Sequence, residues 1–223
     1  FAFDGDADRV GVVDNEGSII RADIVMAILL ADTTKPGQKV VFDVKCSQAL
    51  EETIVKAGAV PIMWKTGHSI IKQKMREEGC PLGGELSGHI FIADDFFGYD
   101  DAIYVAARLA RMVSRSAIPL SEIRKKIPTY HSSPEIRFAC VDDAVKFRIA
   151  KEAESYFKAG HECIDVDGVR VKFPGGWGLV RASNTQPEIV CRVYADTPDG
   201  LAEIEKTITE KLIALGAKPG GGH

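Results

Sequence analysis

Hydrophobic residues in the first 130 positions come in short runs, separated by longer segments whose apolar residues have a helical spacing. The short runs predict strands, and the segments between them predict amphipathic helices. Strands that alternate with helices at these lengths predict an α/β domain with a mixed or largely parallel sheet. The predicted strands cover residues 10–14, 40–44, 60–64, a stretch near 82 and 90–92, and the predicted helices cover residues 24–31, 47–57, 69–78, 100–114 and 120–127.

The pattern changes after the stretch Pro128–Pro134, which is rich in Pro and Ser and predicts a domain boundary. Beyond it we expect a small α+β domain over residues 131–217, with its helices on one face of an antiparallel sheet. The Asp-Gly pair at 167–168 predicts a hairpin turn. The predicted strands cover residues 135–141, 162–166, 169–173, 179–182 and 188–195, and the predicted helices cover residues 142–158 and 199–215. The Gly-rich segment 218–223 is predicted to be a disordered tail.

Side chains that accept hydrogen bonds predict where several helices begin. Asp23, Ser47 and Asp199 each precede an apolar-periodic segment and are expected to cap its free backbone N–H groups. Ser69 is expected to cap the helix that follows it in the same way.

Composition narrows the class of protein without identifying it. The chain has 28 basic and 32 acidic residues, a net charge of -4, so no global charge signal indicates a nucleic-acid partner. Its longest apolar stretch, 24–31, is too short to cross a bilayer. Five scattered cysteines without a Cys-x-x-Cys pair indicate reduced thiols, and with them a cytoplasmic protein.

The segment 4–9 carries the first chemical signal. Asp4, Asp6 and Asp8 alternate after an apolar stub and are followed by Arg9. Carboxylate oxygens on a Gly-containing loop can converge on Mg²⁺, which leaves coordination positions for a phosphoryl oxygen. The neighbouring guanidinium could contact the same group. A solvated turn is the alternative, and haloacid-dehalogenase-type phosphatases and nucleotide-sugar transferases also place Asp-x-Asp after a strand.

Two further segments contain polar residues beside glycine. Residues 65–69 are predicted to join a strand to a helix, so their backbone N–H groups can bind an anion, and His68 adds an imidazole, a common acid or base in catalysis. In the Gly-rich segment 83–89, Glu85 and Ser87 face one way at a spacing of two, which suits vicinal sugar hydroxyls. The alternatives are a simple helix cap and a Gly-rich connection with exposed polar residues.

The fourth segment follows a predicted strand near the C-terminus. Arg181 ends the strand, and Ser183, Asn184 and Thr185 form a turn with hydroxyl, amide and main-chain donors. A forked guanidinium with several neutral donors suits a phosphate group. A polar hairpin loop is the alternative.

Together these segments resemble one family, the α-D-phosphohexomutases, and in particular its bacterial phosphomannomutase/phosphoglucomutase branch. Their order and separation fit across essentially the whole chain. The resemblance rests on the metal-loop motif 4–9, the sugar-loop motif 84–89, the phosphate-loop motif 181–185 and the branch motifs 43–47 and 65–69.

The resemblance implies a four-domain protein around a deep cleft. Residues 1–18 would end domain two, residues 19–130 would form domain three, and residues 131–217 would form domain four. No Ser-His-Asn-Pro-like phosphoserine loop occurs in these 223 residues, so domain one would be absent and the chain alone would lack activity.

The family reaction transfers a phosphoryl group from a phosphoserine to a hexose 1- or 6-phosphate of glucose or mannose, through a hexose 1,6-bisphosphate. The resemblance implies that Mg²⁺ is held by Asp4, Asp6 and Asp8, with Arg9 assisting. It implies sugar binding by Glu85, Ser87 and His89, phosphate binding by Arg181, Ser183, Asn184 and Thr185, and cleft roles in proton transfer or substrate contact for Lys45 and His68.

The missing N-terminal domains would be partners, and no nucleic acid or membrane is expected. A non-catalytic sugar-phosphate-binding module and a metal-dependent sugar phosphatase with Asp4 as nucleophile are the alternatives.

Overall fold

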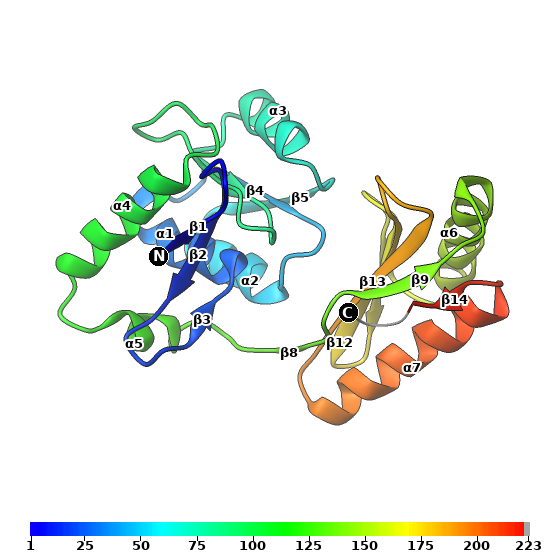
Figure 1. Ribbon diagram of the computed structural model, residues 1–223. Helices are drawn as coiled ribbons and strands as arrows, with labels where there is room; N and C mark the ends of the chain where they lie inside the picture. The colour runs from blue at the N-terminus through cyan, green and yellow to red at the C-terminus, as the bar shows by residue number, and fades with distance from the viewer. Residues whose placement is uncertain (221–223) are drawn as a thin grey trace. The chain divides into compact units, whose positions relative to one another are not determined.

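A computed structural model describes residues 1–220 of the chain. Two compact units make up the fold: the first covers Phe1–Thr129 and the second begins at Tyr130 (Figure 1). The division lies one residue before the position predicted from the stretch rich in Pro and Ser. Among the residues described, no helix is both long enough and apolar enough to cross a membrane.

The first unit is built on a four-stranded sheet in the order β5-β4-β6-β7. β4 is parallel to β5 and β6, whereas β7 is antiparallel to β6, so the sheet is mixed. The three central residues of β4 are fully buried, as expected for a strand covered on both faces. The strands are β4 (Lys39–Asp43), β5 (Val60–Trp64), β6 (Leu82–Gly84) and β7 (Ile90–Ile92), and the helices are α1 (Ala22–Thr33), α2 (Gln48–Lys56), α3 (His68–Glu78), α4 (Ala102–Ser114) and α5 (Leu120–Arg124).

Two adjacent glycines in β6 let helices approach both faces of this sheet. A Cβ at Gly83 would lie 2.5 Å from the Met75 sulfur on α3, and one at Gly84 would lie 2.6 Å from the Met26 sulfur on α1. The missing side chains therefore serve helix packing. They bring α1 and α3 against opposite sides of the strand that leads into the segment 85–89.

A small antiparallel sheet precedes this core in the chain. It has the order β1-β2-β3, with β1 (Ala2–Phe3), β2 (Val10–Val13) and β3 (Ile19–Ile20). Alternate residues of β2 are buried, so one face of this sheet packs inward. Residues 1–18 thus lie in the first compact unit, and their assignment to a preceding domain stays a prediction.

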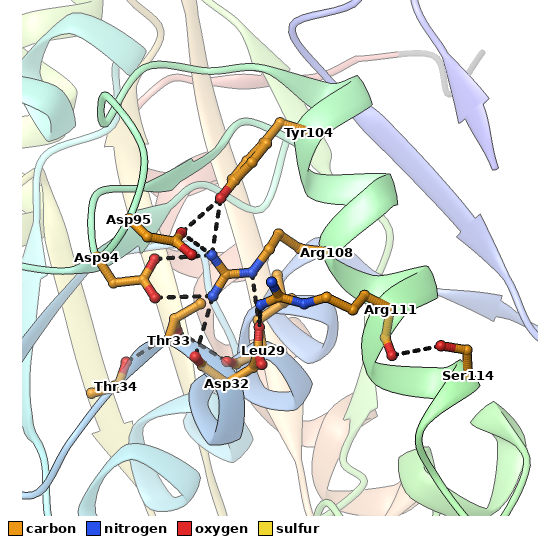
Figure 2. Close-up of polar contacts among 10 residues, drawn as sticks. All are labelled: Leu29, Asp32, Thr33, Thr34, Asp94, Asp95, Tyr104, Arg108, Arg111 and Ser114. Carbon is orange, nitrogen blue, oxygen red and sulfur yellow. Dashed lines mark hydrogen bonds and ion pairs between the residues drawn. The ribbon is translucent and has the colours of Figure 1, made fainter.

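A buried arginine anchors α4 to the rest of the first unit (Figure 2). The Arg108 side chain is 3% exposed; its Nε lies 2.8 Å from Asp32 and its Nη2 lies 2.9 Å from Asp94. Asp95 and the Tyr104 hydroxyl, 3.0 Å away, also accept from its Nη1. Burial lowers the pKa of Arg108, but the hydrogen bonds to Asp94, Tyr104 and Asp32 outweigh this and raise it. The cluster therefore ties α4 to the end of α1 and to the loop after β7.

The second unit is an antiparallel sheet in the order β10-β11-β12-β13-β9-β14, with β8 also paired to β13. Apolar residues of the sheet and of the helices α6 and α7 form one core, so the predicted α+β fold is confirmed. The elements are β8 (His131–Ser132), β9 (Ile136–Ala139), α6 (Asp143–Lys158), β10 (Cys163–Ile164), β11 (Val169–Phe173), β12 (Gly176–Ala182), β13 (Glu188–Ala195), α7 (Pro198–Ala214) and β14 (Lys218–Pro219).

Several helices begin elsewhere than predicted, and for two of them the error has the same cause. Arg21, not Asp23, is the N-cap of α1, and Asp23 is instead buried in the first turn, where it pairs with Arg21 at 2.8 Å. Thr197, not Asp199, caps α7 and accepts a hydrogen bond from the backbone of Gly200. In both helices an aspartate in the first turn was mistaken for the N-cap. Acidic side chains are favourable at either position, because the N-terminal end of a helix carries a partial positive charge.

The predicted disordered tail is wrong for its first residues. Lys218 and Pro219 form the edge strand β14, which pairs with Ala139 and Phe138 of β9. An edge position tolerates proline because its missing N–H costs no ladder hydrogen bond there. The remaining tail prediction falls partly on residues 221–223, outside the described residues.

Candidate active site

The acidic loop joins β1 to β2 and reverses sharply at one residue. Ala7 has φ of 57°, the only positive φ at a residue other than glycine among residues 1–220. This conformation costs roughly 1 kcal/mol, and the backbone of Ala7 is held by bonds to the Asp4 carbonyl at 3.2 Å and the Ala102 N–H at 3.1 Å. The reversal brings one carboxylate oxygen each of Asp4, Asp6 and Asp8 within 4.8 Å of one another.

Arg9 is the counter-ion of this loop. Its Nε lies 2.5 Å from Asp4 Oδ2 and 3.7 Å from Asp8 Oδ1, and its backbone N–H donates to Asp4 Oδ1 at 3.1 Å. The side-chain hydrogen bond lowers the pKa of Asp4 and raises the pKa of Arg9. Burial raises the pKa of Asp8, and the negative charges of Asp6 and Asp4 act in the same direction. Three convergent carboxylates are the oxygen donors that suit a hard divalent cation.

Asp43, at the carboxyl end of β4, connects three of the sequence motifs. Its buried carboxylate accepts hydrogen bonds from the Leu86 backbone at 3.3 Å, the Thr66 hydroxyl at 3.4 Å and the Cys46 thiol at 3.1 Å. Lys45 Nζ lies 3.5 Å from the same group. The motifs 43–47, 65–69 and 84–89 therefore meet at one carboxylate, which the sequence did not single out as a site residue.

Glu85 follows β6 directly and its side chain is buried. The carboxylate accepts a hydrogen bond of 2.5 Å from the backbone N–H of Gly67. Burial raises the pKa of Glu85, while the Gly67 hydrogen bond acts in the opposite direction. Ser87, two residues on, is exposed. The pair thus offers one desolvated carboxylate and one accessible hydroxyl.

The turn that contains Glu85 is closed by its own backbone. Gly88 has φ of 111°, its N–H donates to the Glu85 carbonyl at 3.2 Å, and the Glu85 N–H donates to the His89 carbonyl at 2.8 Å. The Gly88 carbonyl also accepts from Val10 N–H at 3.3 Å. Only glycine adopts this conformation without strain, and it places the acidic loop against the sugar-loop motif.

Two histidines lie beside these loops. His68 is the first residue of α3, whose N-cap is Gly67 and not Ser69 as predicted. The rings of His68 and His89 stack with centroids 5.4 Å apart, and His89 Nδ1 is 3.6 Å from Asp8 Oδ2. Asp100 lies against both rings. The sequence had suggested Asp100 only as a helix start, and nothing local pointed to a site role.

Nine of the residues predicted to act in the site belong to these contiguous loops of the first unit. They are Asp4, Asp6, Asp8, Arg9, Lys45, His68, Glu85, Ser87 and His89. The other four belong to the loop after β12 in the second unit.

Arg181 is the buried member of that second loop. Its Nε lies 3.2 Å from Asp167 Oδ2, and its Nη2 donates to Asp167 Oδ1 at 3.4 Å and to Asn184 Oδ1 at 3.3 Å. Ser183 is also buried, and its hydroxyl oxygen accepts from the N–H groups of Thr185 at 3.4 Å and of the following residue at 3.2 Å. The Ser183 side chain thus shapes the turn, while Asn184 and Thr185 are exposed.

Lys146 on α6 supports this loop from within the unit. Its side chain is 3% exposed, pairs with Asp143 at 2.7 Å and donates to the carbonyl oxygens of Ser183 and Gln186, both at 3.0 Å. Sequence reasoning missed this residue, because a lysine in an amphipathic helix usually lies on the solvent face.

Comparison with known proteins identifies the family. Residues 21–130 match the model of phosphoglucomutase/phosphomannomutase alpha/beta/alpha domain III, and residues 135–211 match that of the phosphoglucomutase/phosphomannomutase C-terminal domain. The chain is 44% identical over 217 residues to phosphomannomutase/phosphoglucomutase of Pseudomonas aeruginosa, which covers 96% of this chain and 47% of that protein. It is 43% identical over 208 residues to phosphoglucomutase of Neisseria meningitidis, covering 92% of this chain and 45% of that protein.

A solved structure agrees with these sequence relatives. The crystal structure of a phosphoglucomutase/phosphomannomutase family protein from Burkholderia thailandensis superimposes with a TM-score of 0.87 at 37% identity, covering 98% of this chain and 47% of that one. The chain spans about half the length of the relatives it matches. With two successive family domains matched over most of its length, the chain belongs to the phosphoglucomutase/phosphomannomutase family.

Proposed function

We propose that this chain supplies the metal, sugar and phosphate loops of a phosphohexomutase that interconverts the 1- and 6-phosphates of glucose and mannose. The observation that carries the proposal is the convergence of four separate motifs in the first unit. Gly88 accepts from Val10 N–H, Glu85 accepts from Gly67 N–H, and Asp43 accepts from Leu86 N–H. A simple helix cap or a solvated turn would not require hydrogen bonds between loops that are distant in the sequence.

The sugar is held by Glu85 and Ser87. Glu85 Oε1 is engaged by Gly67, so the carboxylate has a fixed orientation and can accept hydrogen bonds from sugar hydroxyls. The neighbouring Ser87 hydroxyl is accessible to the same ligand. Binding through the 3- and 4-hydroxyls suits both orientations of a hexose phosphate. It also admits glucose and mannose, which differ at the 2-hydroxyl.

A divalent cation, Mg²⁺, would be held by Asp4, Asp6 and Asp8. Such an ion, when bound, neutralises negative charge on a transferring phosphoryl group. Arg9, already paired with this loop, would contribute a second positive charge beside the same oxygens. The convergence of the three carboxylates supports this role.

The phosphate that does not react is held by the loop at 181–185. Arg181 contributes its guanidinium, and Asn184, Thr185 and the backbone contribute neutral donors. Ser183 keeps the turn in shape by accepting two backbone hydrogen bonds. The resemblance implied sugar binding for His89, but its ring stacks on that of His68 and both lie against Asp100, so we propose proton transfer for the two histidines together. Lys45 would be a neighbouring cation.

Two features bear on the alternatives and on location. Both carboxylate oxygens of Asp4 accept hydrogen bonds from Arg9, which opposes its use as the nucleophile of a phosphatase. All five cysteines are free thiols, which supports a reducing compartment such as the cytoplasm. We further propose that the complete enzyme includes a phosphoserine domain, since the chain has no Ser-His-Asn-Pro-like segment.

Titration of the chain with glucose 1-phosphate and mannose 1-phosphate tests the proposal. We expect both sugars to bind more tightly than inorganic phosphate, and Glu85→Gln to remove the difference between them and phosphate. Equal binding of sugar phosphate and inorganic phosphate would contradict the sugar-binding role. Glu77→Gln is the matched control, because it makes the same change at an exposed carboxylate on α3 that belongs to none of these motifs.

The same sample should show no mutase turnover with glucose 1,6-bisphosphate present. Without a phosphoserine there is no phosphoryl carrier, and positioning alone is worth roughly 7–11 kcal/mol of barrier. A coupled assay for hexose 6-phosphate measures this, after mass spectrometry has excluded a longer protein. Release of inorganic phosphate would instead favour the phosphatase.

A further inference from the structure

We propose that Asp100 is a positioning residue that holds both His68 and His89 in the tautomer with hydrogen on Nδ1. The Nε2 atom of each neutral ring is then the one that can accept a proton. The inference rests on the proposed function only where it assigns the two Nε2 atoms to proton transfer in the reaction.

One carboxylate oxygen serves both rings. Asp100 Oδ2 lies 3.2 Å from His89 Nδ1 and 3.3 Å from His68 Nδ1. Its other oxygen, Oδ1, accepts a hydrogen bond of 2.7 Å from Lys72. The side chain of Asp100 is 9% exposed, so the rings and not water are its close neighbours.

The polar atoms left over here indicate where the hydrogen lies. Within residues 1–220, Asp100 Oδ2 and His89 Nδ1 are both buried without an assigned hydrogen bond, although they are 3.2 Å apart. A buried acceptor without a donor costs about 1–3 kcal/mol. Hydrogen on Nδ1 satisfies both atoms with a small ring rotation, whereas hydrogen on Nε2 would set two acceptors against each other.

The surroundings of His89 favour the same tautomer. Asp8 Oδ2 lies 3.6 Å from its Nδ1, so two carboxylates flank that atom, which has no assigned hydrogen-bond partner within the part of the chain that the structure describes. Its ring stacks with that of His68, at a centroid distance of 5.4 Å, and with that of Phe91, at 6.5 Å and an interplanar angle of 2°. The ring therefore has a fixed plane, and which nitrogen carries hydrogen is set by the partner of the other.

Asp100 is itself held firmly in place. It forms an isolated antiparallel bridge with Phe91 of β7. The next residue, Asp101, caps α4 by accepting from Tyr104 N–H at 2.8 Å. On the other side of the loop, the Arg108 cluster binds two preceding carboxylates (Figure 2). Because the anchored loop already fixes the Asp100 carboxylate, orienting the two rings costs little further conformational entropy at Asp100.

A structural reading would make Asp100 only the ion-pair partner of Lys72, joining α3 to the loop. The two readings differ in what they require of the imidazoles. An ion pair with Lys72 is indifferent to the tautomers of His68 and His89, while a positioning role fixes both. The tautomer is therefore the quantity to measure.

Long-range ¹H–¹⁵N correlation spectra of the histidine-labelled chain report the tautomer of each ring. In the neutral form of each ring, we expect His68 and His89 to show the pattern of hydrogen on Nδ1. Asp100→Ala should shift both toward hydrogen on Nε2, and Asp100→Asn, which keeps an acceptor oxygen, should retain part of the wild-type pattern. Lys72→Met is the matched control: it removes the ion pair but leaves Asp100, so both patterns should stay unchanged.

The signals of His131 and His161 in the second unit verify that each variant sample is intact, and core amides of the first unit verify its fold. Wild-type rings with hydrogen on Nε2 would overturn the proposal. So would unchanged tautomers in folded Asp100→Ala, or a change as large in Lys72→Met. None of these readouts depends on turnover or on sugar binding. A failed sugar titration with the expected tautomers would therefore count against the proposed function alone.

Discussion

The ammonium group of Lys146 lies 3.0 Å from the backbone carbonyl of Ser183, so a buried charge on α6 holds the loop assigned to phosphate. A second bond, to the Gln186 carbonyl, spans the turn from its other end. The loop shape therefore depends on a residue that no ligand needs to touch.

Lys146→Met should loosen this turn. Two carbonyls lose a charged donor, so we expect a loss of stability of about 2 kcal/mol and faster amide exchange at Thr185 and Gln186. Phosphate affinity should fall with it. Lys151→Met, on the exposed face of the same helix, makes the same charge change and should do neither. Equal effects from the two variants would show that only net charge matters.

Arg181 and Asp167 should have opposite effects on phosphate binding. Arg181→Ala removes a charge-assisted donor and should weaken binding by about 1.5–3 kcal/mol. Asp167→Asn removes an anion that pairs with the guanidinium at 3.2 Å, and should tighten binding. Calorimetric titration with glucose 1-phosphate measures both. An unchanged dissociation constant in Arg181→Ala would exclude it from the site, and the exposed Lys172→Ala is the charge-matched control.

The Glu85 carboxylate should lower the free energy of unfolding at neutral pH, although we propose that it binds the sugar. Burial raises the folded-state pKa of Glu85, so the protonated form is favoured in the folded protein. Its contribution to stability is full below the unfolded pKa, about 4.3, and is lost as pH rises through the folded pKa. Glu85→Gln, which stays neutral, should match the wild type in acid and exceed it at pH 7. Denaturant titrations at both values check this, and a deficit at pH 7 would contradict it.

Binding of Mg²⁺ to the chain should be weak and should be opposed by Arg9. Three carboxylates repel one another, and Arg9 Nε already occupies Asp4 at 2.5 Å. Arg9→Gln should therefore tighten cation binding, and Asp6→Asn should weaken it. Line broadening by Mn²⁺ at the amides of residues 4–9 gives the readout. Equal broadening in the two variants would show that the loop 4–9 does not bind the cation. Asp199→Asn, which changes an exposed carboxylate on α7, serves as the control.

Much of the local structure followed from neighbouring residues. The strand Val60–Trp64 and the strand Glu188–Ala195 were predicted to the residue, and Ser47 and Asp142 stand at their predicted helix starts. Periodicity and capping act within one or two turns, so a sequence window contains all that decides them. The motifs of the candidate site were visible for the same reason, since each occupies fewer than about ten residues.

The partners of these motifs were not visible, because they come from distant positions in the chain. Asp43 and Leu86 bond across 43 residues, and Lys146 and Ser183 across 37. Pro219 looked like part of a disordered tail until its pairing with β9 was known. A hydrogen bond of this kind depends on how strands and helices pack, which no local pattern encodes.

The sequence by itself determined the family, the order of the longer strands and helices, and which short segments carry charge and hydroxyl groups. Only the tertiary structure decided that Asp43 joins three motifs and that Gly83 and Gly84 admit helices to both faces of the sheet. It also decided that Asp100 lies against two imidazoles. The physical reason is burial: charged groups removed from water must find specific partners, and only the folded chain places those partners within reach.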